Sequence, residues 1–266
     1  DAFFDRDGET RREFATGVTA QRLESNTGVT ITTRGNLNDF SANEYIQAGP
    51  GYTTEKLPEF RYVRLSDDLI PGRPGLLSSS LDVRGGRYSM SFIEPTAAEL
   101  GYRTTSRSQA AFGIDPDESI ADRLRAEGYV EQGVWRLDAR QQIDSKIVLG
   151  PVNITPFAVG RATLYDNDFD EFSPQENDEL RLWGSAGVTA STSIQRVDNS
   201  AESRLFDVHR LRHIIEPSVT VFHAASTVDS ADLPIYDDDV EGLAEGTTIR
   251  AGINQTLQTE RGAAGR

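Results

Sequence analysis

The stretch LRHIIEPSVTVFH, residues 211–223, carries most of the information about the fold. Its residues alternate with a period of two, which is typical of a β-strand with two different faces. The apolar face carries Ile215, Pro217, Val219 and Val221. The polar face carries Arg212, Glu216, Ser218 and Thr220, joined by Ile214 and Phe222. A soluble strand with one buried face has this pattern, and so does a membrane strand between lipid and water.

Three residues of this stretch support further predictions. Pro217 has no backbone N–H to donate, so we expect it at a bulge or where strand pairing is interrupted. Arg212 and Glu216 share a face, but four residues of extended chain separate them by more than about 10 Å. They are too far apart to contact directly, and we expect them to pair across adjacent strands.

The same alternation extends over the rest of the chain. In residues 180–196 Leu182 and Val188 oppose Arg181 and Thr189, and residues 247–260 repeat the scheme. The other predicted strands are residues 12–23, 28–37, 43–54, 58–66, 76–84, 86–94, 98–112, 133–149 and 152–165. Turn signals separate several of them, at residues 25–28, 70–75, 84–86 and 149–153. The sequence therefore predicts an all-β, antiparallel protein.

One helix is predicted within DPDESIADRLRAEG, residues 115–128. Asp115 is placed to cap it, Pro116 to take its first position and Gly128 to end it. The longest apolar runs fall far short of the 18 residues that indicate a membrane-spanning helix. A membrane barrel needs only strands of about ten residues with alternating polarity, which this chain has.

The lengths of the predicted connections favour a membrane barrel. In chain order they are residues 113–132, 149–152, 166–179, 198–206 and 225–246, so long and shorter connections alternate. In an up-and-down barrel every second connection lies at the same end. Outer-membrane barrels sort their connections in this way, with short periplasmic turns and longer extracellular loops. We therefore predict an antiparallel up-and-down transmembrane β-barrel, of which residues 1–266 supply about ten to twelve strands.

Composition limits the classes of function. The chain has a net charge of −15, which argues against nucleic acid as a partner because phosphate binding requires a basic surface. It contains no cysteine, so it has neither a disulfide framework nor a thiolate metal site. It begins without Met or a signal-peptide pattern and stops after a strand-like run, and we expect an interior piece of a longer chain.

Three phrases resemble the barrel of the LPS-assembly outer-membrane protein family (LptD, also called OstA or Imp). They are EKLPEFRYVRLSDDLIPGRPGLLSSSLDVRGGRY (55–88), LGPVNITPFAVGRATLYDND (149–168) and RLRHIIEPSVTVFH (210–223), which follow one another along the chain in the order that the family has them. The resemblance spans roughly residues 50 to 260. It implies a large outer-membrane barrel that inserts lipopolysaccharide into the outer leaflet. It also implies a plug lipoprotein, periplasmic bridge proteins and outer-membrane lipids as partners. The family's N-terminal periplasmic domain and barrel ends are not expected within this chain, which also lacks the cysteines of well-known members.

On this interpretation the two faces of residues 211–223 meet different solvents. Ile215, Pro217, Val219 and Val221 would face lipid. Arg212, Glu216, Ser218 and Thr220 would face the hydrated lumen. Tyrosines, tryptophans and phenylalanines near strand ends could form the aromatic girdles of a barrel, or reflect the ordinary preference of strands for aromatics: Tyr45, Tyr52, Tyr62, Tyr88, Trp135, Phe157, Tyr165, Trp183 and Phe222.

No catalytic, cofactor or metal site is predicted, and the protein is not expected to be an enzyme. His209 and His213 on one strand lie too far apart to chelate zinc alone. The acidic segments 165–179 and 236–242 lack a complete calcium-loop pattern, so solvated loops are the favoured interpretation. No nucleophile elbow occurs. Two alternatives stay open: a secreted soluble β-sandwich with adhesive or calcium-binding loops, and another outer-membrane barrel such as a porin or a surface enzyme.

Overall fold

The computed structural model describes residues 16–35, 51–166, 169, 179–203, 205–230 and 232–260. These residues form one antiparallel sheet of eleven strands, confirming the all-β antiparallel prediction. The strands are β1 (Thr16–Glu24), β2 (Thr27–Gly35), β3 (Tyr52–Asp68), β4 (Ser78–Phe92), β5 (Gly133–Asp144), β6 (Ile147–Leu149), β7 (Val152–Tyr165), β8 (Leu180–Thr192), β9 (Ile194–Ser203), β10 (Val208–Ser226) and β11 (Gly246–Glu260). Two short helices accompany them, α3 (Thr105–Phe112) and α4 (Ile120–Ala126). No helix within the described ranges is long and apolar enough to cross a membrane.

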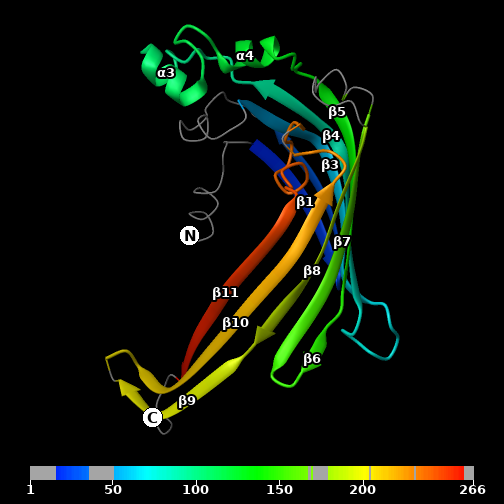
Figure 1. Cartoon of the computed structure of the whole chain (residues 1–266), viewed down its shortest axis with the longest axis vertical. Helices are drawn as coiled ribbons and strands as arrows, with labels where there is room; N and C mark the ends of the chain where they lie inside the picture. The colour runs from blue at the N-terminus through cyan, green and yellow to red at the C-terminus, as the bar shows by residue number, and fades with distance from the viewer. Residues whose placement is uncertain are drawn as a thin grey trace.

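The strands pair in the order of the chain. The main path runs β1-β2-β3-β4-β5-β7-β8-β10-β11, with β6 paired to β7 and β9 to β10. This is the predicted up-and-down order. The sheet curves strongly (Figure 1), but it is open, with β1 and β11 at its two edges. An open edge leaves a row of backbone N–H and C=O groups without a strand partner.

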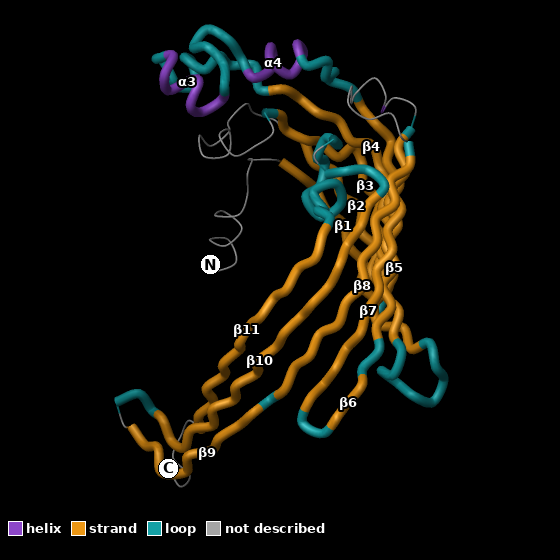
Figure 2. The backbone as a smooth tube through the Cα atoms, viewed as in Figure 1, coloured by secondary structure: helices purple, strands orange, loops and turns teal. Residues whose placement is uncertain are grey.

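Connections differ in length between the two ends of the sheet, as the sequence predicts. The long segments 93–132 and 227–245 lie at one end, where Figure 2 shows α3, α4 and a folded loop. The connections at the opposite end are short, between β1 and β2, β3 and β4, β5 and β7, and β9 and β10. The predicted loop 166–179 lies largely outside the described residues.

Two predictions in the 93–132 segment are wrong. Residues 98–112 are not a strand, because residues 105–112 form α3, whose buried residues Ser108 and Phe112 are four apart as on one side of a helix. The second helix does not begin at Asp115. Ser119 caps α4, with a capping box in which the Ser119 and Asp122 side chains each accept from the other's backbone N–H. Gly128 follows two residues after the helix, at φ 94°.

Two pairs of predicted strands are each a single longer strand. Residues 43–50 lie outside the described residues, but residues 52–54 and all of 58–66 belong to β3. Residues 84–86, predicted as a turn, lie in the middle of β4. Glycine occurs at position 86 because the backbones of β3 and β4 approach closely there, and not because the chain turns. The pairing register shifts between Lys56 and Glu59 of β3, and a Cβ added at Gly86 would lie 2.4 Å from the Pro58 carbonyl oxygen.

Replacing Gly86 by alanine is therefore expected to destabilise the fold by about 1–3 kcal/mol, because the new methyl group meets backbone that cannot turn aside. Gly85 is the matched control. A Cβ there would lie 3.2 Å from the Leu137 side chain, which is half exposed and free to move. Urea unfolding of both variants measures the difference, and equal midpoints would contradict this account of Gly86.

The two faces of the sheet differ in chemistry. We call the face that contacts segment 227–245 the inner face, and the opposite face the outer face. Large apolar side chains on the outer face are exposed: Val29, Ile31, Phe60, Tyr62, Leu137, Leu164, Leu182, Val188, Val219, Val221, Ile249 and Ile253. The inner face carries charged side chains, several of them buried. The hydrophobic core is not between two sheets but at the end with the long connections, around Tyr88, Phe92, Phe112 and Ile120.

Candidate functional site on the inner wall

Five cationic side chains from five strands gather on the inner face. We call Lys56 (β3), Arg84 (β4), Arg136 (β5), Arg161 (β7) and Arg181 (β8) the inner cationic patch. Strand register brings them together, because Arg84 pairs with Asp138, Asp138 with Thr163, and Thr163 with Arg181. They form one group in space although they are scattered over 126 positions of the sequence, from Lys56 to Arg181.

Segment 227–245, the connection between β10 and β11, covers this patch. Figure 1 shows it folded against the inner face of the sheet. Asp237 accepts hydrogen bonds from Lys56 Nζ at 2.5 Å and from Arg136 Nη2 at 2.6 Å. Glu241 accepts from Arg136 Nη1 at 2.5 Å. Asp239 accepts from Arg84 Nη2 at 2.9 Å.

Backbone carbonyls of the same segment complete the contact. Arg181 donates to the carbonyls of Val240 at 2.9 Å, Glu241 at 3.2 Å and Leu243 at 3.0 Å. Arg161 donates to the carbonyl of Asp239. The loop is therefore held by both its side chains and its main chain, and all five members of the patch contact it.

Burial increases the free energy that is lost when one partner of these ion pairs is removed. The side chains of Arg136 and Glu241 are both 0% exposed. The Arg136 guanidinium also lies 4.0 Å from the centre of the Tyr88 ring, a cation–π contact. A buried pair of this kind costs desolvation to form, but removing one partner leaves an uncompensated charge away from water.

Apolar residues of the loop add to the contact. Val228, Leu233, Tyr236 and Val240 are buried, and the first three belong to the hydrophobic cluster at this end of the sheet. The Tyr52 hydroxyl oxygen also accepts a hydrogen bond from the Ile235 backbone N–H of the loop, at 2.7 Å. The loop is docked by hydrophobic and ionic contacts together.

The prediction that the acidic segment 236–242 is a solvated loop is wrong. Among the described carboxylates, Asp237 and Glu241 are two of the least accessible, and arginine and lysine side chains surround them. The other acidic segment, 165–179, lies mostly outside the described residues. Within the part of the chain that is described, no group of three or more His, Asp or Glu side chains is arranged to hold a metal ion.

The electrostatic environment favours ionised Asp237. Burial raises the pKa of this carboxyl, but the charges of Arg136 and Lys56 and their hydrogen bonds lower it by more. The pKa of Asp237 therefore lies below its ordinary value.

Acidification is expected to weaken loop docking. The pKa of Asp237 is lower in the docked state than in the free chain, so its stabilisation is full above the unfolded value of about 4 and is lost as pH falls through the docked value. Trp183 reports on docking, because its Nε1 donates to the Ala244 carbonyl at 3.4 Å. A shift of Trp183 emission below about pH 4 in a Trp135→Phe background is expected. If the Asp237→Asn variant showed the same acid-induced shift of Trp183 emission, titration of Asp237 would not be its cause.

The residues predicted from 211–223 lie on β10, and they alternate between the two faces. Pro217 lies where pairing is interrupted, as predicted. Ser218 pairs with Ser191 of β8 and Ile215 with Ile194 of β9, so Pro217 faces the junction between these two strands. Val219 and Val221 lie on the outer face and are exposed. On the inner face, the hydroxyls of Thr220 and Thr189 lie 2.9 Å apart.

Arg212 bonds across adjacent strands, as predicted. Its Nε donates to the Gln195 side chain on β9 at 2.9 Å, and its Nη1 to the Gln258 side chain on β11 at 3.4 Å. Glu216 does not follow the prediction. Its register partner on β11 is Asn254, and within the described ranges its carboxylate forms no bond to a neighbouring strand.

The histidines and aromatics of the sequence are distributed as follows. His213 Nε2 lies 3.1 Å from Gln255 Oε1, and His209 Nδ1 lies 4.0 Å from Glu260 Oε2, so each contacts a different residue of β11. The proposed aromatic girdle is wrong for three residues that are buried in the core: Tyr52, Tyr88 and Tyr165. Tyr62 and Trp135 are exposed. Tyr45 lies outside the described residues.

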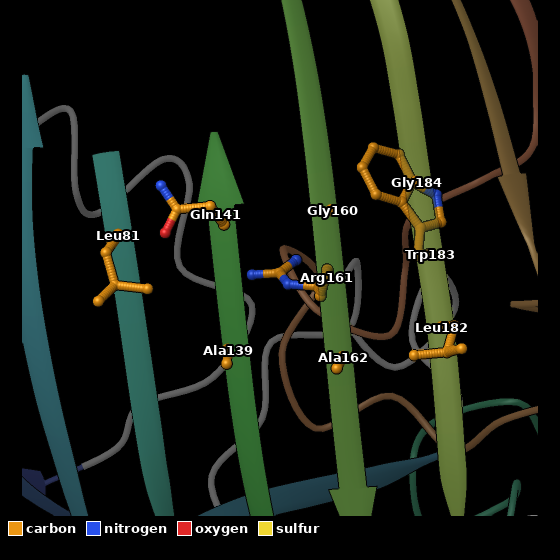
Figure 3. Close-up of a pocket in the computed structure, with 9 residues that line it drawn as sticks. All are labelled: Leu81, Ala139, Gln141, Gly160, Arg161, Ala162, Leu182, Trp183 and Gly184. Atoms are coloured by element: carbon orange, nitrogen blue, oxygen red, sulfur yellow. The ribbon is translucent and has the colours of Figure 1, made fainter. Parts of the chain in front are cut away.

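A shallow apolar groove of about 500 Å³ lies on the outer face. Figure 3 shows Leu81 of β4 and Leu182 of β8 on either side of β5 and β7. Three of the lining residues between them, Ala139, Gly160 and Ala162, have little or no side chain. The hollow follows from this run of small residues across neighbouring strands.

Comparison of the sequence with models of known protein families gives no match, and comparison with curated proteins gives none either.

Proposed function

We propose that this chain forms part of the wall of an outer-membrane β-barrel that takes part in lipopolysaccharide assembly. The proposed location in a membrane rests on the distribution of polar and apolar side chains over the two faces of the sheet. Large apolar side chains of the outer face are exposed, while arginines of the inner face are buried. This is the reverse of a soluble protein, which buries its apolar face, and it is what a barrel wall between lipid and a polar lumen requires.

The topology supports the same proposal. Neighbouring strands follow one another in the chain, all pairs are antiparallel, and long connections gather at one end. These are features of outer-membrane barrels, whose longer loops are extracellular. A membrane sheet cannot leave an edge open to lipid, so the strands that pair with β1 and β11 would complete a larger barrel.

The faces of β10 follow from this proposal. Ile215, Pro217, Val219 and Val221 would contact acyl chains. Arg212, Glu216, Ser218 and Thr220 would line the lumen. The inner cationic patch and its loop would then lie inside the barrel, near the extracellular end.

The secreted β-sandwich is the less favoured alternative. A sandwich packs the apolar face of one sheet against a second sheet. Within the described residues there is a single sheet, and its apolar face is the exposed one. A porin-like barrel would share the wall described above, and the assay of lipopolysaccharide below separates the two.

The narrower proposal, lipopolysaccharide assembly, is supported by the resemblance of residues 55–88, 149–168 and 210–223 to the LptD family. It implies transfer of lipopolysaccharide from periplasmic bridge proteins, through a barrel plugged by a lipoprotein, into the outer leaflet. No bond is made or broken in this step. The protein would act as a conduit and not as an enzyme.

Cell fractionation followed by gel electrophoresis tests the membrane proposal. The protein is expected in the outer-membrane fraction, as a compact band that migrates differently after boiling, because a folded barrel resists detergent until heated. Recovery in the soluble fraction without a mobility shift would overturn the proposal in favour of the sandwich.

Depletion of the protein tests the narrower proposal. Cells that lose it should retain newly made lipopolysaccharide inside and display less at the surface, measured by surface labelling of the saccharide. A depleted strain with normal surface lipopolysaccharide but reduced uptake of small solutes would favour the porin-like alternative.

A further inference from the structure

The inner cationic patch keeps unused hydrogen-bond donors even under the docked loop. The Nε groups of Arg84, Arg136 and Arg161 are buried and make no hydrogen bond among the described residues, although Arg161 Nε lies 3.1 Å from Asp138 Oδ1. Arginine presents several N–H groups in a rigid fork. Three buried N–H donors of the patch are therefore unpaired beneath the docked loop, together with one buried acceptor, Asp138 Oδ2.

Charge balance on the wall depends on the loop. The five cations of the patch face three carboxylates of the strands, Glu59, Asp82 and Asp138. The loop adds Asp237, Asp239 and Glu241. Without the loop, positive charge would exceed negative charge at this position, in a chain whose net charge is −15. The loop thus occupies the patch as an anionic ligand would.

We propose that the inner cationic patch is a binding site for a ligand that carries two or more phosphate groups, and that loop 227–245 occupies this site as an intrinsic competitor. Guanidinium groups bind phosphate through paired N–H donors. Three loop carboxylates within five residues already satisfy the patch, so the matching ligand carries several negative charges. This inference goes beyond the proposed function, and it holds whether or not the wall lies in a membrane.

The fold allows the loop to be removed without breaking the sheet. The described residues of segment 227–245 form no strand or helix, and the segment joins β10 and β11, which pair with each other as far as Ala224 and Gly246. A short turn can connect two antiparallel neighbours of this kind. Because the loop and the ligand would compete for one site, shortening the loop should raise the apparent affinity for the ligand.

A loop-shortened variant tests the site directly. Residues 229–244 are replaced by a short Gly–Ser turn, and the purified full chain in detergent is titrated with inorganic pyrophosphate by calorimetry at constant ionic strength. Binding at least about tenfold tighter than in the wild type is expected. Mixed micelles with cardiolipin, a lipid with two phosphate groups, compared with phosphatidylcholine, show whether a lipid headgroup is bound as well as, or in place of, the free phosphate.

Two further variants in the loop-shortened background locate the binding. The double change Arg136→Gln and Arg181→Gln should abolish the gain in affinity. Arg250→Gln is the matched control, since Arg250 lies on the inner face, opposite Thr220, but outside the patch. A shortened variant with unchanged circular dichroism that binds neither phosphate probe better than the wild type overturns the proposal, as does a gain that survives the double change.

The intact chain supplies a second measurement that does not depend on shortening the loop. Glu241 is buried by docking, whereas Glu245 in the same loop is exposed. Pyrophosphate or cardiolipin should therefore accelerate cleavage after Glu241 by a glutamate-specific protease, with cleavage after Glu245 as the internal control. An unchanged rate at Glu241 with both probes overturns the competition. Cell fractionation tests the outer-membrane location separately. The outcome of the protease experiment therefore does not decide the proposed function.

Discussion

Arg136→Met is expected to destabilise the docked state by about 3–5 kcal/mol, the usual cost of removing one partner of a buried ion pair. The change leaves Glu241, which is fully buried, without its cation, and it takes one of two cations from Asp237. A carboxylate buried without its cation loses the attraction that offsets the cost of taking its charge out of water. The loop should leave the inner face so that both carboxylates regain water.

Two measurements check this prediction. Cleavage after Glu241 by a glutamate-specific protease reports release of the loop, and urea unfolding followed by tryptophan fluorescence reports the stability of the sheet. The double change Arg136→Met and Glu241→Met should recover part of the loss, because it leaves no charge unpaired at that position. Arg22→Ala is the control, since it removes a pair whose side chains are 80% and 72% exposed. Its stability should match the wild type, and a loss as large as that of Arg136→Met would contradict the account.

Val188→Lys is the second change with a large expected effect. Val188 lies on the outer face of β8, between Pro156 of β7 and Val221 of β10. If this face meets lipid, a lysine there costs about 2–4 kcal/mol near the bilayer midplane. We expect loss of the compact, heat-sensitive band and failure of assembly in the outer membrane.

Thr189→Lys is the matched control for this experiment. Thr189 is the next residue along β8, but it lies on the inner face beside Thr220. A lysine on the lumen side stays hydrated, so this variant should assemble. If both variants assemble equally well, the outer face does not contact lipid and the membrane proposal fails.

The sequence predicts the strands best where alternation is uninterrupted. Residues 152–165 and 247–260 match β7 and β11 almost to the residue, because each side chain reports which face it occupies. Alternation failed at Gly85 and Gly86, where a glycine signals close backbone contact within a strand as readily as a turn. It also failed at residues 98–112, where a short helix lies in a long connection.

The inner cationic patch could not be predicted from the sequence. Arg136 and Glu241 are 105 residues apart, and Arg84 and Asp239 are 155 apart. Each strand contributes a single arginine to the patch, so no local pattern indicates that they meet. The signal in the sequence was a positively charged residue at an inner-face position of each of β4, β5, β7 and β8. It becomes informative only when the strand register is known.

The position of loop 227–245 has a mechanical consequence. One segment bonds to β3 through Lys56, to β5 through Arg136 and to β8 through Arg181, so it spans a curved sheet from one part of the arc to another. It acts as a chord across that arc. The paired strands from β3 to β8 fix the length of the arc, so a chord of fixed length sets its radius. These bonds therefore fix the curvature of the wall between β3 and β8. Releasing the loop would leave this part of the sheet free to flatten or to widen.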